Sequence, residues 1–570
     1  MESMPANYAV PSLEEDPALG LSQRAKMEIL FAVMLGLFLG ALDQTIVGPA
    51  LPTIVTNLSG NDYYVWAVTI YLLTSTISVP FWGKLSDIYG RKPMFMLGIV
   101  IFLIGSALSG LSQNMAMLIA FRGLQGIGAG ALFPVALAVI GDLFTPQERG
   151  KYQGLFGAVF GIAFVAGPLI GGYLTDTFSW HWIFYVNIPI GIIALIVIQR
   201  LLPTVKTRNA SRNFDIVGGV IFSISMVFLL VGLTNKQFGD WATGPVGGFI
   251  AIGIIGTLLF IFVESRAKEP IVPLDLWKGR TYSATMVAVF FAAFAFFGAI
   301  VFLPRWFQVV QGFSATNSGL ALLPLMVGLI TSSVVSGLIV SRTGRYKWLI
   351  VGSLALMGVA VFLMTGLTKD TPLGIVWLWM LLAGLGVGTS FAVPTIVIQN
   401  AVPFSQLGVA TSNLTFFRQI GGTVALAFVG TIFGTTFADQ LGPQVIAAGV
   451  PPQALAIFAQ GGAGSFDLSQ LTGVGDLGAK ILAQFPQAAP YIGQLVDGIH
   501  GAFSLATAQT FYLGVVGSIV AVLAAVAIKE IPLRSSNEQP VYGETPTAAA
   551  PAQLPVAEGA VRSSSQPSSD

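Results

Sequence analysis

Apolar stretches about 20 residues long recur along this chain from Met27 to Ile528, with short polar segments between them. An α-helix needs about this length to cross the hydrocarbon core of a bilayer. Of the 570 residues, 54% are hydrophobic and only 9% are charged, whereas an ordinary soluble domain has roughly 25% charged residues. A water-soluble fold of this size could not cover its own surface. The sequence therefore predicts an all-α, polytopic membrane protein.

Fourteen membrane helices are predicted from these stretches. Their cores lie near residues 29–50, 64–83, 94–112, 115–140, 152–174, 182–200, 216–234, 245–264, 282–303, 317–340, 348–367, 373–398, 407–434 and 505–528. With the N-terminus inside, Lys and Arg gather in the cytoplasmic loops, and the outer loops hold only Lys236, Arg305, Lys369 and Lys480. The positive-inside rule then places both termini in the cytoplasm. We expect a multi-pass protein of the cytoplasmic (inner or plasma) membrane.

Three segments are predicted to lie outside the membrane. Residues 1–22 form a cytoplasmic N-terminal tail, and residues 535–570 are rich in Pro, Ala, Ser and Gln, which is typical of a disordered tail. Residues 435–503 form an outer loop that is too long for a simple turn. Its apolar pieces "PQALAIFAQ" and "LGAKILAQF" favour short amphipathic helices or a hairpin on the outer face.

An internal repeat divides the membrane region. The stretch "GKLSDIYGRK" from Gly83 recurs in outline as "GLIVSRTGRYK" from Gly337, which places Gly90 opposite Gly344. The pattern predicts an N-terminal six-helix bundle at residues 23–200 and a C-terminal six-helix bundle at residues 281–534. Residues 201–280 form a linker with two inserted membrane helices. Repeats related by an axis along the membrane normal are a transporter architecture, with the substrate site near the midplane between the halves.

The repeat is not complete in its charged residues. Asp87 lies opposite Ser341, and Arg122 lies opposite Met380. The charged chemistry is therefore predicted to reside in the N-terminal half.

Five motifs resemble those of one family. They are "LDQTIVGPALP", "GKLSDIYGRKP", "RGLQGIGAG", "GPLIGGYL" and "WHWIFYVNIPIG", in or beside the first six predicted helices. Together they resemble the major facilitator superfamily, specifically its fourteen-span drug:proton antiporters, which include the quaternary ammonium compound exporters. The resemblance covers the chain from about Arg24 to Arg534. It implies export of lipophilic, cationic compounds in exchange for protons by alternating access. The alternative is export of an endogenous lipid, peptide or secondary metabolite by the same mechanism.

Asp43 and Arg122 are the candidate proton-coupling residues. Asp43 lies about 13 Å from the end of the first span at Pro52, and Arg122 lies about 12 Å from the start of the fourth span at Asn114. The two opposite charges therefore share a depth. Ionisable groups at membrane depth are costly and are seldom kept without a use. If the helices are neighbours, as the resemblance implies, burial favours the protonated acid and Arg122 favours the ionised acid, which suits proton exchange. A purely structural ion pair is the alternative.

The loop after the second predicted span is the candidate gate, formed by Gly83, Asp87, Gly90, Arg91 and Lys92. Gly90 suits a tight turn, and Asp87 and Arg91 are near enough to make or break a charge-assisted bond between helix ends. Such a bond can hold one of two conformations. The alternative interpretation is a basic loop that only sets topology.

Two further sets of residues complete the predicted site. Small residues and a proline in the fifth span form the motif that the resemblance associates with antiport, although close helix packing is the alternative: Gly167, Pro168, Gly171 and Gly172. A substrate cavity could be lined by Asp43, Trp66, Tyr71, Gln125 and Phe133, although isolated aromatic residues in spans more often pack or face lipid. Arg418 is interpreted as a snorkelling residue that caps nearby carbonyls.

Several classes of protein are excluded or disfavoured by the sequence. A polytopic enzyme is not expected, because no HExxH or GxSxG pattern lies in the spans, and no GxxxxGK[ST] loop for ATP is present. The chain has no Cys and two His, so we expect neither a metal site nor any cofactor, with the proton gradient as the energy source. A net charge of +1 argues against a nucleic-acid partner. The expected partners are small-molecule substrates, protons and the lipid bilayer, and we expect a monomer.

Overall fold

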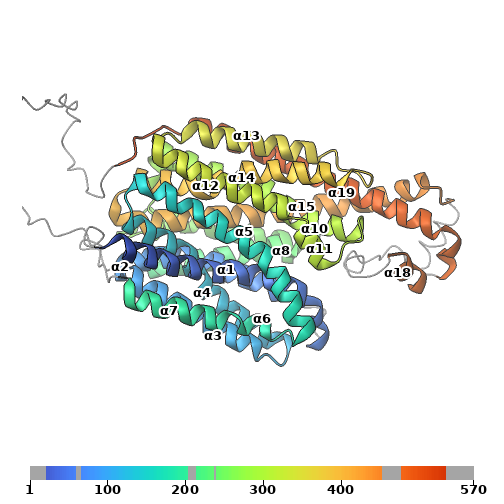
Figure 1. Ribbon diagram of the computed structural model, residues 1–570, viewed down its shortest axis with the longest axis horizontal. Coiled ribbons are helices and arrows are strands. Elements are labelled where there is room, and N and C mark those ends of the chain that lie inside the picture. Colours follow the sequence, from blue (N-terminus) through green and yellow to red (C-terminus); the bar gives the residue numbers. More distant parts are fainter. Residues whose placement is uncertain are drawn as a thin grey trace, which may run out of the picture. The chain divides into compact units, whose positions relative to one another are not determined.

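The computed structural model describes residues 21–58, 66–202, 214–236, 239–451, 477–484 and 486–534 (Figure 1). Within these ranges all regular structure is helical, which confirms the all-α prediction. Most of the predicted N-terminal tail, the whole tail 535–570 and the stretch "PQALAIFAQ" lie outside the described residues.

Fourteen membrane-crossing segments can be followed in the described ranges. Thirteen of them are long and apolar enough to span a membrane by length and composition. The remaining segment is α2 (Trp66–Tyr89), a 24-residue helix that carries Lys84 and Asp87 at its end. Its interior is richer in hydroxyl groups than an ordinary span, from Thr69, Thr74, Ser75, Thr76 and Ser78.

Seven described helices form the N-terminal half. Side chains that accept from free backbone N–H groups begin several of them: Ser22 for the first, Asn114 for the fourth, and Thr145 with Glu148 as a capping box for the fifth. The helices are α1 (Gln23–Asn57), α2, α3 (Arg91–Gly110), α4 (Met115–Leu143), α5 (Pro146–Thr177), α6 (Trp182–Tyr185) and α7 (Asn187–Leu201).

The C-terminal half repeats this arrangement with longer final helices. Its segments are η3 (Leu274–Lys278), α10 (Arg280–Val309), α11 (Ala315–Leu320), α12 (Leu323–Thr343), α13 (Lys347–Met364), α14 (Leu373–Ala401), η4 (Phe404–Gln406), α15 (Leu407–Ala447), α18 (Leu477–Gln484), η6 (Pro486–Tyr491) and α19 (Ile492–Ala527). Each half has its own hydrophobic core. The residue boundaries proposed for the two bundles remain a prediction.

Two predicted spans are interrupted near a proline. The sixth span consists of α6 and α7, with Pro189 in the first turn of α7, and the tenth consists of α11 and α12, with Pro324 in the first turn of α12. Proline has no backbone N–H and is tolerated in the first helical turn, where that group has no partner in the helix. The break in the sixth span places Asn187 at the start of α7.

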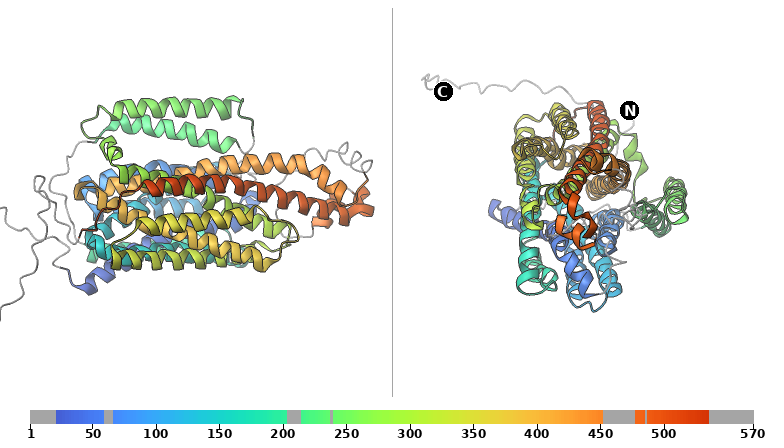
Figure 2. Two further views of the ribbon diagram at one scale, coloured as in Figure 1. Left: turned by 90° about the horizontal axis from the view of Figure 1, so that it is seen from above. Right: turned by 90° about the vertical axis from the view of Figure 1, so that its right-hand side faces the viewer.

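The last two spans extend beyond their predicted ends. α15 has 41 residues and α19 has 36, and their extensions run side by side past the other helices, with α18 beside them (Figures 1 and 2). A Cβ added to Gly498 would lie 2.5 Å from the Cα of Val445, so the two extensions pack closely. Residues 435–447 and 492–503, which were predicted to belong to an outer loop, therefore continue the last two spans, and residues 477–484 of the predicted amphipathic stretch form α18.

The two inserted helices lie along one side of the bundle (Figure 2). α8 (Ile216–Asn235) packs its Phe222 ring near Phe81 of α2 and Phe416 of α15. α9 (Phe249–Glu264), which follows the π-helical turn η2 (Gly244–Gly248), contacts mainly α8. Its outer face is apolar and exposed, as expected of a surface against lipid: Ile252, Ile254, Ile255, Leu258, Leu259 and Phe262.

Candidate functional site

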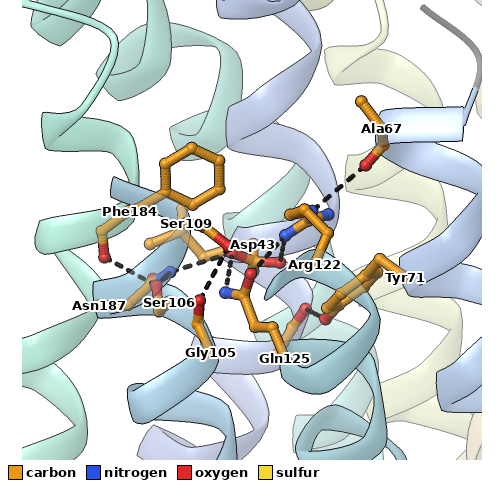
Figure 3. A network of polar contacts seen from close by, with 12 residues as sticks. Asp43, Ala67, Tyr71, Gly105, Ser106, Ser109, Arg122, Gln125, Phe184 and Asn187 are labelled. Carbon is orange, nitrogen blue, oxygen red and sulfur yellow. Dashed lines mark hydrogen bonds and ion pairs between the residues drawn. The ribbon is translucent and has the colours of Figure 1, made fainter. Parts of the chain in front are cut away.

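The polar centre of the N-terminal half is an ion pair between Asp43 of α1 and Arg122 of α4 (Figure 3). Arg122 Nη1 lies 2.6 Å from Asp43 Oδ2. Asp43 is 0% exposed and Arg122 is 1% exposed. The predicted proximity of the two charges is therefore confirmed. A fully buried pair of this kind is energetically costly unless further hydrogen bonds satisfy its remaining groups.

Two amide side chains supply those hydrogen bonds to the carboxylate. Gln125 Nε2 and Asn187 Nδ2 donate to Asp43 Oδ1 over 2.8 and 3.0 Å. Asn187 also donates to Ser106 of α3, whose hydroxyl donates to the carbonyl of Phe184 (Figure 3). With Arg122, three side chains donate to Asp43, an arrangement suited to the ionised form. Helices α1, α3, α4 and α7 and the short α6 segment thus contribute to one network.

Asn187 and Ser106 were not among the sequence-predicted site residues. Asn187 is 0% exposed and lies in the motif "WHWIFYVNIPIG", where it is the only amide in an apolar segment. A buried amide in a span is costly unless it has a partner. That signal could have identified Asn187, whereas Ser106 resembles many other span hydroxyls.

The Arg122 guanidinium is enclosed by aromatic and polar groups. Its central carbon lies 4.1 Å from the centre of the Tyr71 ring, which is a cation–π contact. It also donates to Gln125 Oε1 over 2.8 Å and to the carbonyl of Ala67 over 3.4 Å. The Tyr71 hydroxyl donates to the carbonyl of Gly40 over 3.5 Å. Tyr71 and Gln125 therefore surround the ion pair.

A separate cavity lies between the two halves. Seven helices line it: α1, α2, α4 and α5 from one half and α10, α14 and α15 from the other. The volume of the cavity, measured as the space available to the centre of a water molecule, is about 130 Å³. Its wall contains six phenylalanines: Phe133, Phe160, Phe164, Phe296, Phe297 and Phe391.

Of the five residues predicted to line a cavity, Phe133 is the one found in the described wall of this cavity. The wall does not include Tyr71, Gln125 or Asp43, because Gln125 is hydrogen-bonded to Asp43 and Tyr71 packs on Arg122 inside the N-terminal half. Gln44, the residue after Asp43, lines the cavity instead. Adjacent residues on a helix point in different directions, so one of the two faces the network and the other the cavity. Trp66 begins α2 and does not line the cavity.

Arg418 of α15 lies in the cavity wall. It caps a carbonyl, as predicted, because Nη2 donates to the oxygen of Ser390 over 2.9 Å. The snorkelling interpretation is wrong, however, because the guanidinium lies 4.8 Å from the centre of the Phe391 ring and lines the space between the halves. Arg418 was therefore missed as a cavity residue.

The predicted gate residues form contacts across the two halves. Asp87 pairs with Arg91, as expected, and it also accepts from the N–H groups of Gly408 and Val409 at the start of α15 over 3.1 and 2.9 Å. A carboxylate is favoured at a helix N-terminus, where N–H groups are free. Asp87 thus connects α2 to α15.

Neighbouring residues hold the turn in place. Gly90 has a φ of 97°, which an L-residue adopts only under strain, so the glycine is required there. Arg91 Nε also lies 2.9 Å from Asp142 Oδ2 of α4, and Lys92 donates to the carbonyl of Gln199 over 2.7 Å. Gly83 allows close approach of the halves, because an added Cβ would overlap the Ser412 hydroxyl. Asp142 is a further charge that the sequence analysis missed.

The four residues of the predicted antiporter motif bring α5 against two other helices. A Cβ on Gly167 or Gly171 would overlap α1, at the Thr45 side chain and the Ile46 carbonyl. Pro168 and Gly172 face α11 of the other half. The packing alternative is thus confirmed, and the link to antiport remains a prediction. No group of three or more His, Asp or Glu that could hold a metal occurs among the residues described.

These features define a multi-pass helical membrane protein built from two similar halves, with a cavity between them and a buried ion pair in one half. Residues 33–426 match the Major Facilitator Superfamily. The chain therefore belongs to this superfamily of membrane transporters.

Two relatives and one solved structure illustrate the similarity. Multidrug transporter protein MdtP of Bacillus subtilis (strain 168) is 40% identical over 444 residues, which cover 77% of this chain and 81% of the relative. Multidrug resistance protein 3 of the same organism is 35% identical over 417 residues, covering 72% and 80%. The structure of the proton:xylose symporter XylE superposes with a TM-score of 0.54 at 14% identity and covers 88% of this chain and 95% of that one, which supports the fold alone.

Proposed function

We propose that this protein is a proton-coupled antiporter that exports lipophilic small molecules across the cytoplasmic membrane by alternating access. The observation that carries the proposal is the buried Asp43–Arg122 pair beside a cavity between the two halves. The similarity to a multidrug transporter and to a multidrug resistance protein of Bacillus subtilis supports drug export as the physiological role. Export of an endogenous lipid, peptide or secondary metabolite is the second candidate, since the same cavity would accept such molecules.

The proposed cycle assigns a task to each part of the site. Asp43 exchanges the proton: when it is protonated, its ion pair with Arg122 is lost and the network between α1, α3, α4 and α7 must rearrange. Asp87 holds the end of α2 against the start of α15 while the cavity is closed on that side. With both termini in the cytoplasm, that side is the cytoplasmic one. The protein acts as a monomer and uses the proton gradient without a cofactor.

The cationic substrate expected from the family resemblance receives no support from the cavity. No Asp or Glu belongs to the described wall, and the one charged residue there is Arg418. A cation in this space would meet like charge without a compensating acid. We therefore propose export of lipophilic molecules without requiring that they be cationic.

The test is uphill transport in proteoliposomes with an imposed pH gradient. Asp43→Asn is expected to abolish gradient-driven substrate accumulation, because the amide keeps the shape and one acceptor but carries no exchangeable proton. Asp370→Asn, which removes an exposed carboxylate in the loop before α14, is the matched control and should transport like the wild type. Full proton-coupled transport by Asp43→Asn would refute the assignment.

A further inference from the structure

Arg418 is a cation without a counter-charge in the described part of the cavity. No described acidic side chain pairs with it, and the only hydrogen bond found for its guanidinium there goes to the Ser390 carbonyl. A guanidinium has five N–H donors in a planar fork. Most of these donors are therefore left for a group that enters the cavity.

The surroundings of Arg418 are strongly apolar. The Phe391 ring lies beside its guanidinium and continues into a row of rings that crosses both halves: Phe391 to Phe160 at 5.4 Å, Phe160 to Phe133 at 4.8 Å, and Phe391 to Phe296 at 5.7 Å. In such a low-dielectric site a charge interaction is much stronger than in water. A charge that is desolvated without a partner is correspondingly costly.

Depth places Arg418 well inside the bundle. It lies ten residues along α15 from Gly408, whose N–H binds Asp87, and ten residues of helix span about 15 Å. The cavity at this level takes in Gln44 and Gln419, whose Oε1 atom is buried without a hydrogen-bond partner. The wall thus offers one fork of donors, a few neutral polar groups and a large aromatic surface.

We infer that Arg418 is the recognition site for an amphiphilic organic anion: a lipophilic, ring-bearing molecule with one carboxylate or sulfonate group that accepts from the guanidinium. Arg binds such planar oxyanions through two parallel N–H···O bonds, and the row of rings from Phe133 to Phe296 supplies apolar surface for the rest of the molecule. This inference rests on the proposed export function and specifies its substrate class. Asp43 and Arg122 take no part in it, because their charges already neutralise each other within the N-terminal half.

Binding of three matched probes tests the inference. 1-Pyrenebutyrate, 1-pyrenebutanol and 1-pyrenebutylammonium share one ring system and differ in charge. Their binding is measured by energy transfer from tryptophan, with the protein in nanodiscs of zwitterionic lipid at neutral pH and empty nanodiscs as blanks. The wild type should bind the carboxylate about tenfold more tightly than the alcohol, as a charge-assisted bidentate contact allows, and the ammonium most weakly. Equal affinity for all three probes, or preference for the ammonium, would overturn the inference.

Substitutions identify the group responsible. Arg418→Gln should weaken 1-pyrenebutyrate binding about tenfold and leave 1-pyrenebutanol within about twofold, and Arg418→Lys should keep part of the preference. Arg345→Gln removes the same charge from an exposed turn and should change nothing. An unchanged preference in Arg418→Gln would show that another group selects the anion. If that variant does not fold, the wild-type ranking with Arg418→Lys decides.

The binding test is independent of proton coupling. No proton gradient is applied, so the order of the three probe affinities does not depend on whether the protein exports in exchange for protons. If the protein shows no preference for the anionic probe but transport depends on protons, the inferred substrate class alone is refuted. If it prefers the anionic probe but transport does not depend on protons, the proposed proton-coupled function alone is refuted.

Discussion

The two halves of the molecule repeat one turn but give it different chemistry. Gly90 in the first half and Gly344 in the second occupy corresponding positions, and both have positive φ, at 97° and 67°. The first turn carries Asp87, which binds the start of α15; the second carries Ser341, which packs against Gly150 near the start of α5 without a charge. The positive φ that favours glycine is thus repeated, although ψ differs, at 156° for Gly90 and 0° for Gly344, and the charged contact is not repeated. One helix-end contact can respond to charge, and its counterpart serves as packing.

The same contrast holds for the cations inside the bundle. Arg122 of the first half is paired and enclosed, while its counterpart in the sequence repeat is Met380, which is 0% exposed in an apolar core. The second half has Arg418 instead, in the cavity and without an acidic partner among the described residues. The paired charge of Arg122 interacts within its own half, whereas the charge of Arg418 is available to a ligand.

Replacing Arg122 with methionine, the residue at the corresponding position of the second half, should have the largest effect. Arg122→Met leaves the Asp43 carboxylate buried without its cation. Removal of one partner of a buried ion pair lowers the free energy of unfolding by about 3–5 kcal/mol. Uphill transport should be lost as well. Thermal unfolding in detergent measures the first effect. The double variant Asp43→Leu/Arg122→Met should recover part of the stability but no transport, and a single variant as stable as the wild type would contradict the neutralised-pair interpretation.

The charge of the substrate should be visible in the response to membrane potential. Moving one charge through 100 mV is worth about 2.3 kcal/mol. Export of a monovalent anion against one proton moves two charges and is worth about twice that, whereas export of a monovalent cation against one proton is electroneutral. We expect an inside-negative potential set with potassium and valinomycin to drive export without a pH gradient. Insensitivity to potential would contradict an anionic substrate.

Removing the charge from the first turn should slow the cycle without changing affinity. Asp87→Asn loses the ion pair with Arg91 and weakens the contacts with the N–H groups of Gly408 and Val409. Turnover should fall about tenfold, with probe binding within about twofold, because the change affects a conformational step. Ser341→Ala in the second turn is the matched control and should be nearly silent. Equal losses from both variants would mean that the two turns do the same work.

The smallest effect is expected from one donor of the Asp43 network. Asn187→Leu removes one of three donors to the ionised carboxylate, and a hydrogen bond to a charged group is worth about 1.5–3 kcal/mol. Because Gln125 and Arg122 still donate to the carboxylate, uphill transport should weaken but not be lost. Asn235→Leu, at the end of inserted helix α8, is the control. A loss of transport as complete as that expected for Asp43→Asn would show that the remaining donors do not hold the network.

Much of the fold follows from the sequence because membrane helices are local. The apolar runs, the turn at Gly90 and the shared depth of Asp43 and Arg122 need only residue counts and helix rise. The α15 and α19 extensions were less predictable, since their composition outside the apolar runs does not distinguish a continued helix from a separate amphipathic one. Asp142 was missed because its partner Arg91 lies 51 positions away in the chain.

Length, hydrophobicity and charge spacing by themselves determined that this chain is a helical membrane protein with an acid and an arginine at one depth. Only the tertiary structure decided which way each side chain points. In a soluble helix an apolar stripe marks the buried face, but the apolar residues of α4 and α14 are spread around the whole helix and form no such stripe. Their rotation is set by packing against neighbouring helices. That rotation, and that of α1 and α15, put Asp43 in a closed network and its neighbour Gln44 in the cavity opposite Arg418.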